Sequence, residues 1–153
     1  MSDATRALDQ QLRLVVLPAL KEQGFEFDRR RTFRRAGPDG AIQIVNFQVG
    51  ERSMEGQFTV NLGVYRPGDP IHDTKVELGK VMEHHCPSER RKRLGELRAP
   101  AFAGLRQVPV LGVLFGSVDR WWPISGAEQI TRRSLEKVTK ALVDQGLPWL
   151  ERQ

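Results

Sequence analysis

The chain of 153 residues is 39% hydrophobic and 28% charged and has a single cysteine, which predicts one soluble domain, residues 1–153, and excludes an internal disulfide. Its net charge of +5 and pI of about 9.9, carried by 18 arginines against 6 lysines, favour an acidic protein or a nucleic acid as partner. No apolar run approaches the roughly 20 residues of a membrane-spanning helix, and MSDATRALDQ is unlike a signal peptide, so we expect no membrane association and a cytoplasmic location.

The first predicted element is a helix over residues 3–23. Its apolar residues recur at the three- and four-residue spacing of a helix face, namely Leu8, Leu12, Val15, Val16, Ala19 and Leu20. Ser2 or Asp3 is placed to cap its start, and Gly24 is placed to end it. Pro18 is incompatible with a regular helix interior, so we expect a kink near Val15 or two helical pieces.

Three strands are predicted next, because the apolar period changes to two after Gly24. Residues 25–34 alternate in this way, and the turn-forming segment 36–40 should reverse the chain. Further strands are expected over about 41–49 and 57–65. Together the three should form an antiparallel meander.

The pairing of the second and third strands can be predicted residue by residue. A hairpin centred between Ser53 and Met54 places Val49, Phe47 and Val45 opposite Phe58, Val60 and Leu62 on one apolar face. The opposite face then carries Asn46 opposite Asn61, with Gln48 beside them. A slip by two residues would keep both faces but separate the asparagines. Two interpretations of the amides stay open, a buried ladder that fixes the register and a surface that binds a partner.

The rest of the chain gives weaker signals before a clear final helix. We expect a short helix around 74–84, short strands over 90–98 and 110–115, and a connection at 119–123. Ser125 and Glu128 have capping-box spacing, and Gly146 is placed to end the last helix. Leu147, Trp149 and Leu150 should then pack back onto the sheet. The expected fold is α+β, a mainly antiparallel sheet with the N- and C-terminal helices packed on one face.

A series of short motifs spans nearly the whole chain in a characteristic order. They are GF at 24–25, Phe33, VNFQ at 45–48, FTVNLGVY at 58–65, RLGEL at 93–97, DRWW at 119–122 and GLPWL at 146–150. In this order and spacing the sequence resembles the bacterial domain of unknown function 4304. The resemblance implies an α+β fold and a stand-alone bacterial protein, and it brings no established activity. In that family a cysteine followed by a histidine precedes the RLGEL-like strand, whereas here Pro87 follows Cys86.

Catalytic and metal-binding motifs give little support to an enzyme. His84, His85 and Cys86 are adjacent, and neighbouring side chains rarely converge on one ion or form a nucleophile–base pair. No glycine-rich phosphate loop, GxSxG or HExxH occurs. We therefore expect no catalytic set, no metal and no cofactor, and we interpret Cys86 as a structural thiol.

The leading hypothesis is a non-catalytic protein-binding module, immunity-like or regulatory, of a bacterial cytoplasmic protein. A small basic α+β domain with a half-polar sheet face suits a protein that neutralises a partner by covering its surface. Arginine and tryptophan are also frequent at the centres of interfaces. The expected binding surface consists of Asn46, Gln48, Asn61, Tyr65, Trp121 and Trp122.

Two other functions stay open. A stripe of Arg29, Arg31, Arg34, Arg91 and Arg93, flanked by aromatic side chains, would suit a single-stranded nucleic acid. The same arginines also fit the ordinary protection of strand edges by charge. The last alternative is a small-ligand-binding protein or an enzyme of unknown reaction.

Overall fold

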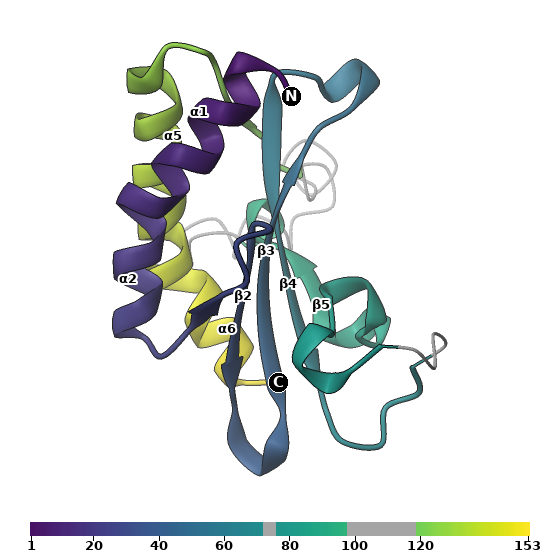
Figure 1. Cartoon of the computed structure of the whole chain (residues 1–153). Helices are drawn as coiled ribbons and strands as arrows, with labels where there is room; N and C mark the ends of the chain where they lie inside the picture. The colour runs from purple at the N-terminus through teal and green to yellow at the C-terminus, as the bar shows by residue number, and fades with distance from the viewer. Residues whose placement is uncertain (72–75, 98–118) are drawn as a thin grey trace, which may run out of the picture.

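The computed structural model describes residues 1–71, 76–97 and 119–153. Within them, an antiparallel sheet in the order β1-β2-β3-β4-β5 carries the N- and C-terminal helices on one face, and β6 pairs with β4 beyond this path (Figure 1). The predicted α+β architecture, with both terminal helices on one face of a mainly antiparallel sheet, is therefore confirmed. No helix among the described residues is long and apolar enough to cross a membrane.

The N-terminal helix is divided as its proline predicts. Helix α1 (Asp3–Gln11) begins at Ser2, whose hydroxyl accepts a hydrogen bond from the Thr5 amide at 3.2 Å. A π-helical turn, Leu12–Val16, follows and leads into α2 (Leu17–Glu22), which has Pro18 in its first turn. The extra residue of the π turn accommodates the ring that a regular helix interior would exclude. Gly24 then ends the helix with a φ of 85°.

The predicted first strand is wrong in one respect, because residues 25–34 form a hairpin rather than one strand. Strand β1 (Glu26–Phe27) pairs with β2 (Thr32–Ala36), which places Phe27 opposite Phe33. The Asp28 carboxylate closes the turn between them, accepting hydrogen bonds from the amides of Arg30 at 2.8 Å and Thr32 at 3.2 Å. Each strand places one phenylalanine toward the core. The apolar residues therefore alternate along the sequence as they would in a single strand.

The predicted register of the central hairpin is confirmed. Strand β3 (Ile42–Val49) pairs with β4 (Gln57–Tyr65) so that Val49 faces Phe58 and Asn46 faces Asn61. Burial of one apolar face fixes this register, because a one-residue slip would expose that whole face.

Aromatic rings form a continuous row across the helix-covered face of the sheet. Successive contacts join Phe27, Phe33, Phe47, Phe58 and Trp122, with ring centroids 4.6 to 6.0 Å apart. These rings pack with buried leucines of both terminal helices, including Leu8, Leu12, Leu135 and Leu142. This cluster is the main hydrophobic core.

The C-terminal helix starts and ends differently from the prediction. Helix α5 (Glu128–Ala141) has Ala127 at its N-cap, and Ser125 instead accepts a hydrogen bond from the Ala127 amide at 3.1 Å, so no capping box forms. Gly146 does not end the helix, because a π turn (Leu142–Gly146) continues into α6 (Leu147–Glu151). The backbone of Gly146 is helical, and a Cβ on this residue would lie 3.1 Å from Leu142 Cδ2 and 3.2 Å from Leu94 Cδ1. Close packing explains this glycine. The predicted packing of Leu147 and Leu150 into the core is confirmed.

The other face of the sheet is covered by the segment after β4. Residues 76–90 contain short 3₁₀ turns in place of the described part of the predicted helix at 74–84. Val81 and Cys86 form a second small core with Ile44 and Tyr65 of the sheet. Isolated buried residues between short turns can cover a sheet, and such a segment needs no helix with an apolar face.

The remaining strands are shorter than predicted. Strand β5 (Arg91–Arg93) pairs with β4, and the expected strand 90–98 otherwise gives way to a 3₁₀ turn at Leu94–Glu96. Strand β6 (Trp122–Pro123) lies where a connection was expected and pairs with the start of β4. The predicted strand 110–115 lies outside the described residues.

Candidate functional site

A polar row crosses the sheet on the face opposite the terminal helices. In the strand register Thr32 pairs with Asn46, Asn46 with Asn61, and Asn61 with Arg93. Residues paired in this way point to the same face. The predicted amide pair and one end of the predicted basic patch therefore share one row of side chains.

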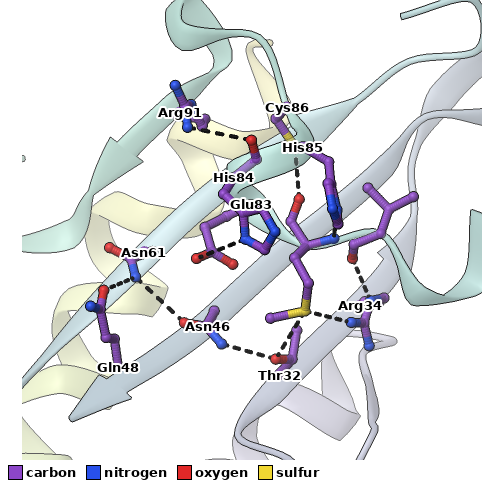
Figure 2. Close-up of polar contacts among 12 residues, drawn as sticks. Thr32, Arg34, Asn46, Gln48, Asn61, Glu83, His84, His85, Cys86 and Arg91 are labelled. Carbon is purple, nitrogen blue, oxygen red and sulfur yellow. Dashed lines mark hydrogen bonds and ion pairs between the residues drawn. The ribbon is translucent and has the colours of Figure 1, made fainter. Parts of the chain in front are cut away.

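Hydrogen bonds join this row into what we call the amide ladder, consisting of Thr32, Asn46, Asn61 and Gln48 (Figure 2). The Asn46 side-chain nitrogen donates to Thr32 Oγ1 at 2.9 Å, and Thr32 donates onward to the Met82 sulfur at 3.7 Å. The Asn61 nitrogen donates to Gln48 Oε1 at 2.9 Å and, more weakly, to Asn46 Oδ1 at 3.4 Å. Three of these residues are buried and Gln48 is exposed. Most of the ladder is thus buried on the sheet, and its Gln48 end reaches solvent.

The exposed end of the ladder offers two free polar groups. In the described part of the chain, neither the Asn61 Oδ1 nor the Gln48 Nε2 has a hydrogen-bond partner. Both atoms point away from Asn46 in Figure 2. An acceptor beside a donor is the complement of one residue in an extended backbone, which presents its N–H and its C=O on the same side. The hydrogen bond between the two side chains holds this pair in position.

The free amide groups border a polar pocket of about 370 Å³. Its walls come from β3, β4, β5 and the turns beside them, and they include Gln48, Asn61, Glu83, His84, Arg91, Lys92, Arg93 and Glu96. Acidic and basic groups therefore face one open cavity, which suits a ligand or partner surface that also carries both charges.

Glu83 and His84 form the roof of this pocket. Glu83 Oε1 lies 4.0 Å from His84 Nδ1, and the other carboxylate oxygen of Glu83 is buried without a hydrogen-bond partner in the described structure. A buried carboxylate oxygen without a donor is costly. Glu83 also lines the polar pocket, so its carboxylate adds a negative charge to the pocket wall.

The basic side of the pocket is a segment that we call the basic edge, Arg91, Lys92 and Arg93. Arg91 and Lys92 are exposed, and Arg91 makes a long hydrogen bond of 3.5 Å to the His84 carbonyl. Arg93 is more constrained, because it pairs with Asp119 and lies over the Trp121 ring at 5.5 Å. Asp119 also accepts a hydrogen bond from Trp121 Nε1 at 3.0 Å, so Trp121 adjoins the basic edge.

The other predicted basic residues lie elsewhere, and two of them, Arg31 and Arg34, have structural partners. Arg29 and Arg31 are in the β1–β2 turn, and β5 lies beyond β2, β3 and β4. Arg31 binds Asp9 through two hydrogen bonds of 2.5 and 2.9 Å, which raises the pKa of its guanidinium. Arg34 pairs with Asp28 and donates to the Val81 carbonyl at 2.7 Å, which fastens the segment covering the ladder. The structure therefore does not bring the five arginines into one patch.

The predicted aromatic residues are also divided. Tyr65 is buried in the second core, and its hydroxyl donates to the Asp69 carbonyl at 3.0 Å. Trp122 is buried in the main core, whereas Trp121 is partly exposed. Of the expected binding surface, Gln48 and Trp121 remain accessible, the buried Asn61 lines the polar pocket, and Asn46 is buried beside it.

Cys86 lies near the pocket but has the environment of a structural residue. Burial raises the pKa of its thiol to about 12, and the nearby Glu83 carboxylate adds to this effect. The thiol donates a weak hydrogen bond to the Met82 carbonyl at 3.7 Å. The described residues contain no group of three His, Cys, Asp or Glu side chains placed to hold a metal ion.

Three contributors to this site are absent from the residues predicted to form it. Glu83, Lys92 and Asp119 lie on short turns and strands whose positions the periodicity of the sequence does not determine. One available signal was Gly63, because a glycine within a strand often marks close approach by another segment. A Cβ on Gly63 would meet the segment carrying Glu83.

The similarity to known proteins agrees with the order of motifs along the chain. Neither a curated protein nor a solved structure matches the sequence. The model of one family, described as a domain of unknown function (DUF4304), matches residues 16–152. This match covers nearly the whole chain, and the chain therefore belongs to the DUF4304 family.

Proposed function

We propose that the chain is a non-catalytic protein-binding module of the bacterial cytoplasm, immunity-like or regulatory, whose contact surface is centred on the polar pocket. The observation that carries this proposal is the free Asn61 oxygen beside the free Gln48 nitrogen. Together they match the N–H and C=O of one residue in an extended partner segment.

The charges around the amides support a polar partner segment. Arg91 and Lys92 are exposed and suit acidic side chains, and the Glu83 carboxylate on the pocket wall suits a basic group. Arginine is frequent at interface centres, and Trp121 adds an aromatic border to the same surface. The amides fix orientation, and the charges select among partners.

A pull-down from the source cells tests the proposal. Tagged protein is isolated with and without nuclease and compared with two double variants, each changing one glutamine and one arginine. Gln48→Ala/Arg91→Glu alters the pocket, and Gln10→Ala/Arg13→Glu makes the same exposed changes on the helical side. We expect a stoichiometric protein that survives nuclease, is retained by the control and is lost by the pocket variant.

The proposal fails if the pocket variant retains that protein as well as the native chain does. Circular dichroism of both variants excludes unfolding as the cause of a loss. A salt titration adds a further check, because a protein contact that depends on the amides should survive moderate salt better than purely ionic binding.

Nucleic-acid binding is the second candidate function, and the basic edge favours it. Arg91 and Lys92 are exposed beside Arg93 and Trp121, which join a cation to an aromatic ring. In this case the preparation should carry an ultraviolet-absorbing component that nuclease removes. Its affinity should fall steeply with salt, and Arg91→Glu should abolish it.

A further inference from the structure

A second pocket lies on the other side of Trp121, between β6 and α5, and has a volume of about 250 Å³. We call it the tryptophan pocket. It is lined mainly by Arg120, Trp121, Ile130, Arg133, Ser134 and Lys137. Its α5 residues follow the spacing of one helix face, because positions 130, 133, 134 and 137 recur every three or four residues. The pocket is separate from the polar pocket.

The charges of this pocket are all of one sign. Its lining includes three basic residues and no carboxylate, and Arg120, Arg133 and Lys137 form no ion pair within the described residues. Arg133 and Lys137 are four residues apart on one helix, where like charges destabilise each other. An anion held between them would remove this repulsion.

The other two basic residues of α5 differ, because both form ion pairs. Arg132 pairs with Glu136 at 3.0 Å, and Lys140 pairs with Asp144 at 2.5 Å. The two basic residues of α5 outside the pocket lining are thus each paired with a carboxylate four residues further along, whereas in the described structure the two that line the pocket are not. Within α5, the basic residues without an ion pair to a described residue are therefore the ones that line the pocket.

The walls of the pocket are held in place by contacts that involve none of its cationic groups. Ser134 Oγ donates to the Pro123 carbonyl at 2.8 Å, which ties α5 to β6. Trp121 is fixed by its hydrogen bond to Asp119, and Trp122 is anchored beside Phe58 in the core. Ile130 is 45% exposed and supplies an apolar border. The site therefore combines fixed aromatic and apolar walls with unpaired cations.

We propose that the tryptophan pocket binds a phosphate monoester of a small molecule that carries a flat ring. A monoester has a charge approaching −2 at neutral pH, and its oxygens suit several cations at once. Arg120, Arg133 and Lys137 bind the phosphate group. The ring of the ligand packs against Trp121 and Ile130.

Titration with phenyl phosphate, followed by nuclear magnetic resonance of the three tryptophan indole N–H groups, tests the proposal. Trp121→Phe assigns the Trp121 signal. We expect a saturable shift of this signal and an affinity at least about tenfold lower for Arg133→Gln/Lys137→Gln, which removes two charge-assisted contacts. The control Arg132→Gln/Lys140→Gln removes the same charges from ion-paired positions outside the pocket lining and should stay within about twofold of the native affinity.

Inorganic phosphate and an oligothymidine complete the experiment. Phenyl phosphate binding more tightly than inorganic phosphate supports the ring contact, and equal affinities overturn that part. No saturable shift, or an equal loss in the control, overturns the site. Tight binding of oligothymidine alone, abolished by Arg91→Glu, would assign the surface to nucleic acid and likewise overturn it. Because no variant of the partner pull-down touches α5, failure of this proposal can be told from failure of the protein-binding function.

Discussion

The backbone of Glu83 lies directly against Gly63 of β4, so that a Cβ on residue 63 would come within 3.1 Å of the Glu83 Cα. The same Cβ would lie 2.9 Å from the sulfur of Cys86. The absence of a side chain at one position in the strand thus lets the segment 83–86 rest on the sheet. This contact places Glu83 and His84 over the polar pocket.

Gly63→Ala should therefore destabilise the protein. The added methyl group meets backbone as well as side-chain atoms, and overpacking of this kind costs about 1 to 3 kcal/mol. Urea unfolding measures the loss. Gly79→Ala is the control, because a Cβ at Gly79 meets nothing within 4 Å, and it should leave the free energy of unfolding nearly unchanged. Equal stability of the two variants would contradict the close contact.

The amide ladder should behave as one coupled unit. Asn46→Ala removes the donor to Thr32 and an acceptor for Asn61, and we expect a loss of about 1 to 3 kcal/mol. Asn61→Ala alone should also destabilise, and Asn46→Ala/Asn61→Ala should cost less than the sum of the two. A double-mutant cycle by urea unfolding measures the coupling. Strict additivity would show that the side chains act independently.

Two of the turn arginines with positive φ, Arg29 and Arg31, should respond oppositely to glycine. Arg29 has a φ of 65°, is exposed and has no described partner, so Arg29→Gly should stabilise by up to about 1 kcal/mol. Arg31 has a φ of 66° but binds Asp9, so Arg31→Gly should destabilise through loss of the bidentate ion pair. Thermal unfolding of both variants measures the two changes in stability. A gain in stability for Arg31→Gly would mean that the ion pair contributes little.

The Cys86 thiol should be inert in the folded protein. Its pKa is raised to about 12 by burial, so at pH 8 it should react with a disulfide reagent far more slowly than after unfolding in urea. Rapid stoichiometric labelling of the native chain would contradict this burial.

The same shift gives a prediction for stability at high pH. The unfolded thiol loses its proton near pH 9 and the folded thiol keeps it, so this contribution to stability is complete below that pH and declines as pH rises toward 12. The decline is at most about 1.4 kcal/mol per pH unit. Cys86→Ala should lack it, and the difference between the two unfolding curves isolates the thiol.

The sequence is most informative where one pattern has one structural solution. The hairpin of β3 and β4 buries an alternating apolar face, so its register, including Asn46 opposite Asn61, follows from the alternation. The alternation at 25–34 has two solutions, because a strand and a tight hairpin both turn Phe27 and Phe33 to the same side. The Asp28 hydrogen bonds favour the hairpin over the single strand, but they give no signal in the hydrophobic periodicity of the sequence.

Pro18 and Pro148 differ in how well the sequence around them predicts where a helix is interrupted. Pro18 correctly indicated a divided helix, whereas Gly146 before Pro148 suggested a stop that does not occur. In both helices a π turn precedes a Leu-Pro-x-Leu segment, so the second case could have been inferred from the first. The polar pocket could not have been inferred from the sequence. Glu83 and the basic edge meet the amides only through short turns, and such turns give no periodic signal.

The late position of α5 in the chain has a consequence for synthesis. The aromatic row on β1 to β4 is complete by residue 58, but the helices that cover it include α5 and α6, which end at residue 151. A nascent chain must therefore hold a partly uncovered phenylalanine surface until α5 and α6 leave the ribosome. Such surfaces attract chaperones and other nascent chains. Expression of this protein should accordingly depend on how quickly α5 and α6 are synthesised after β4.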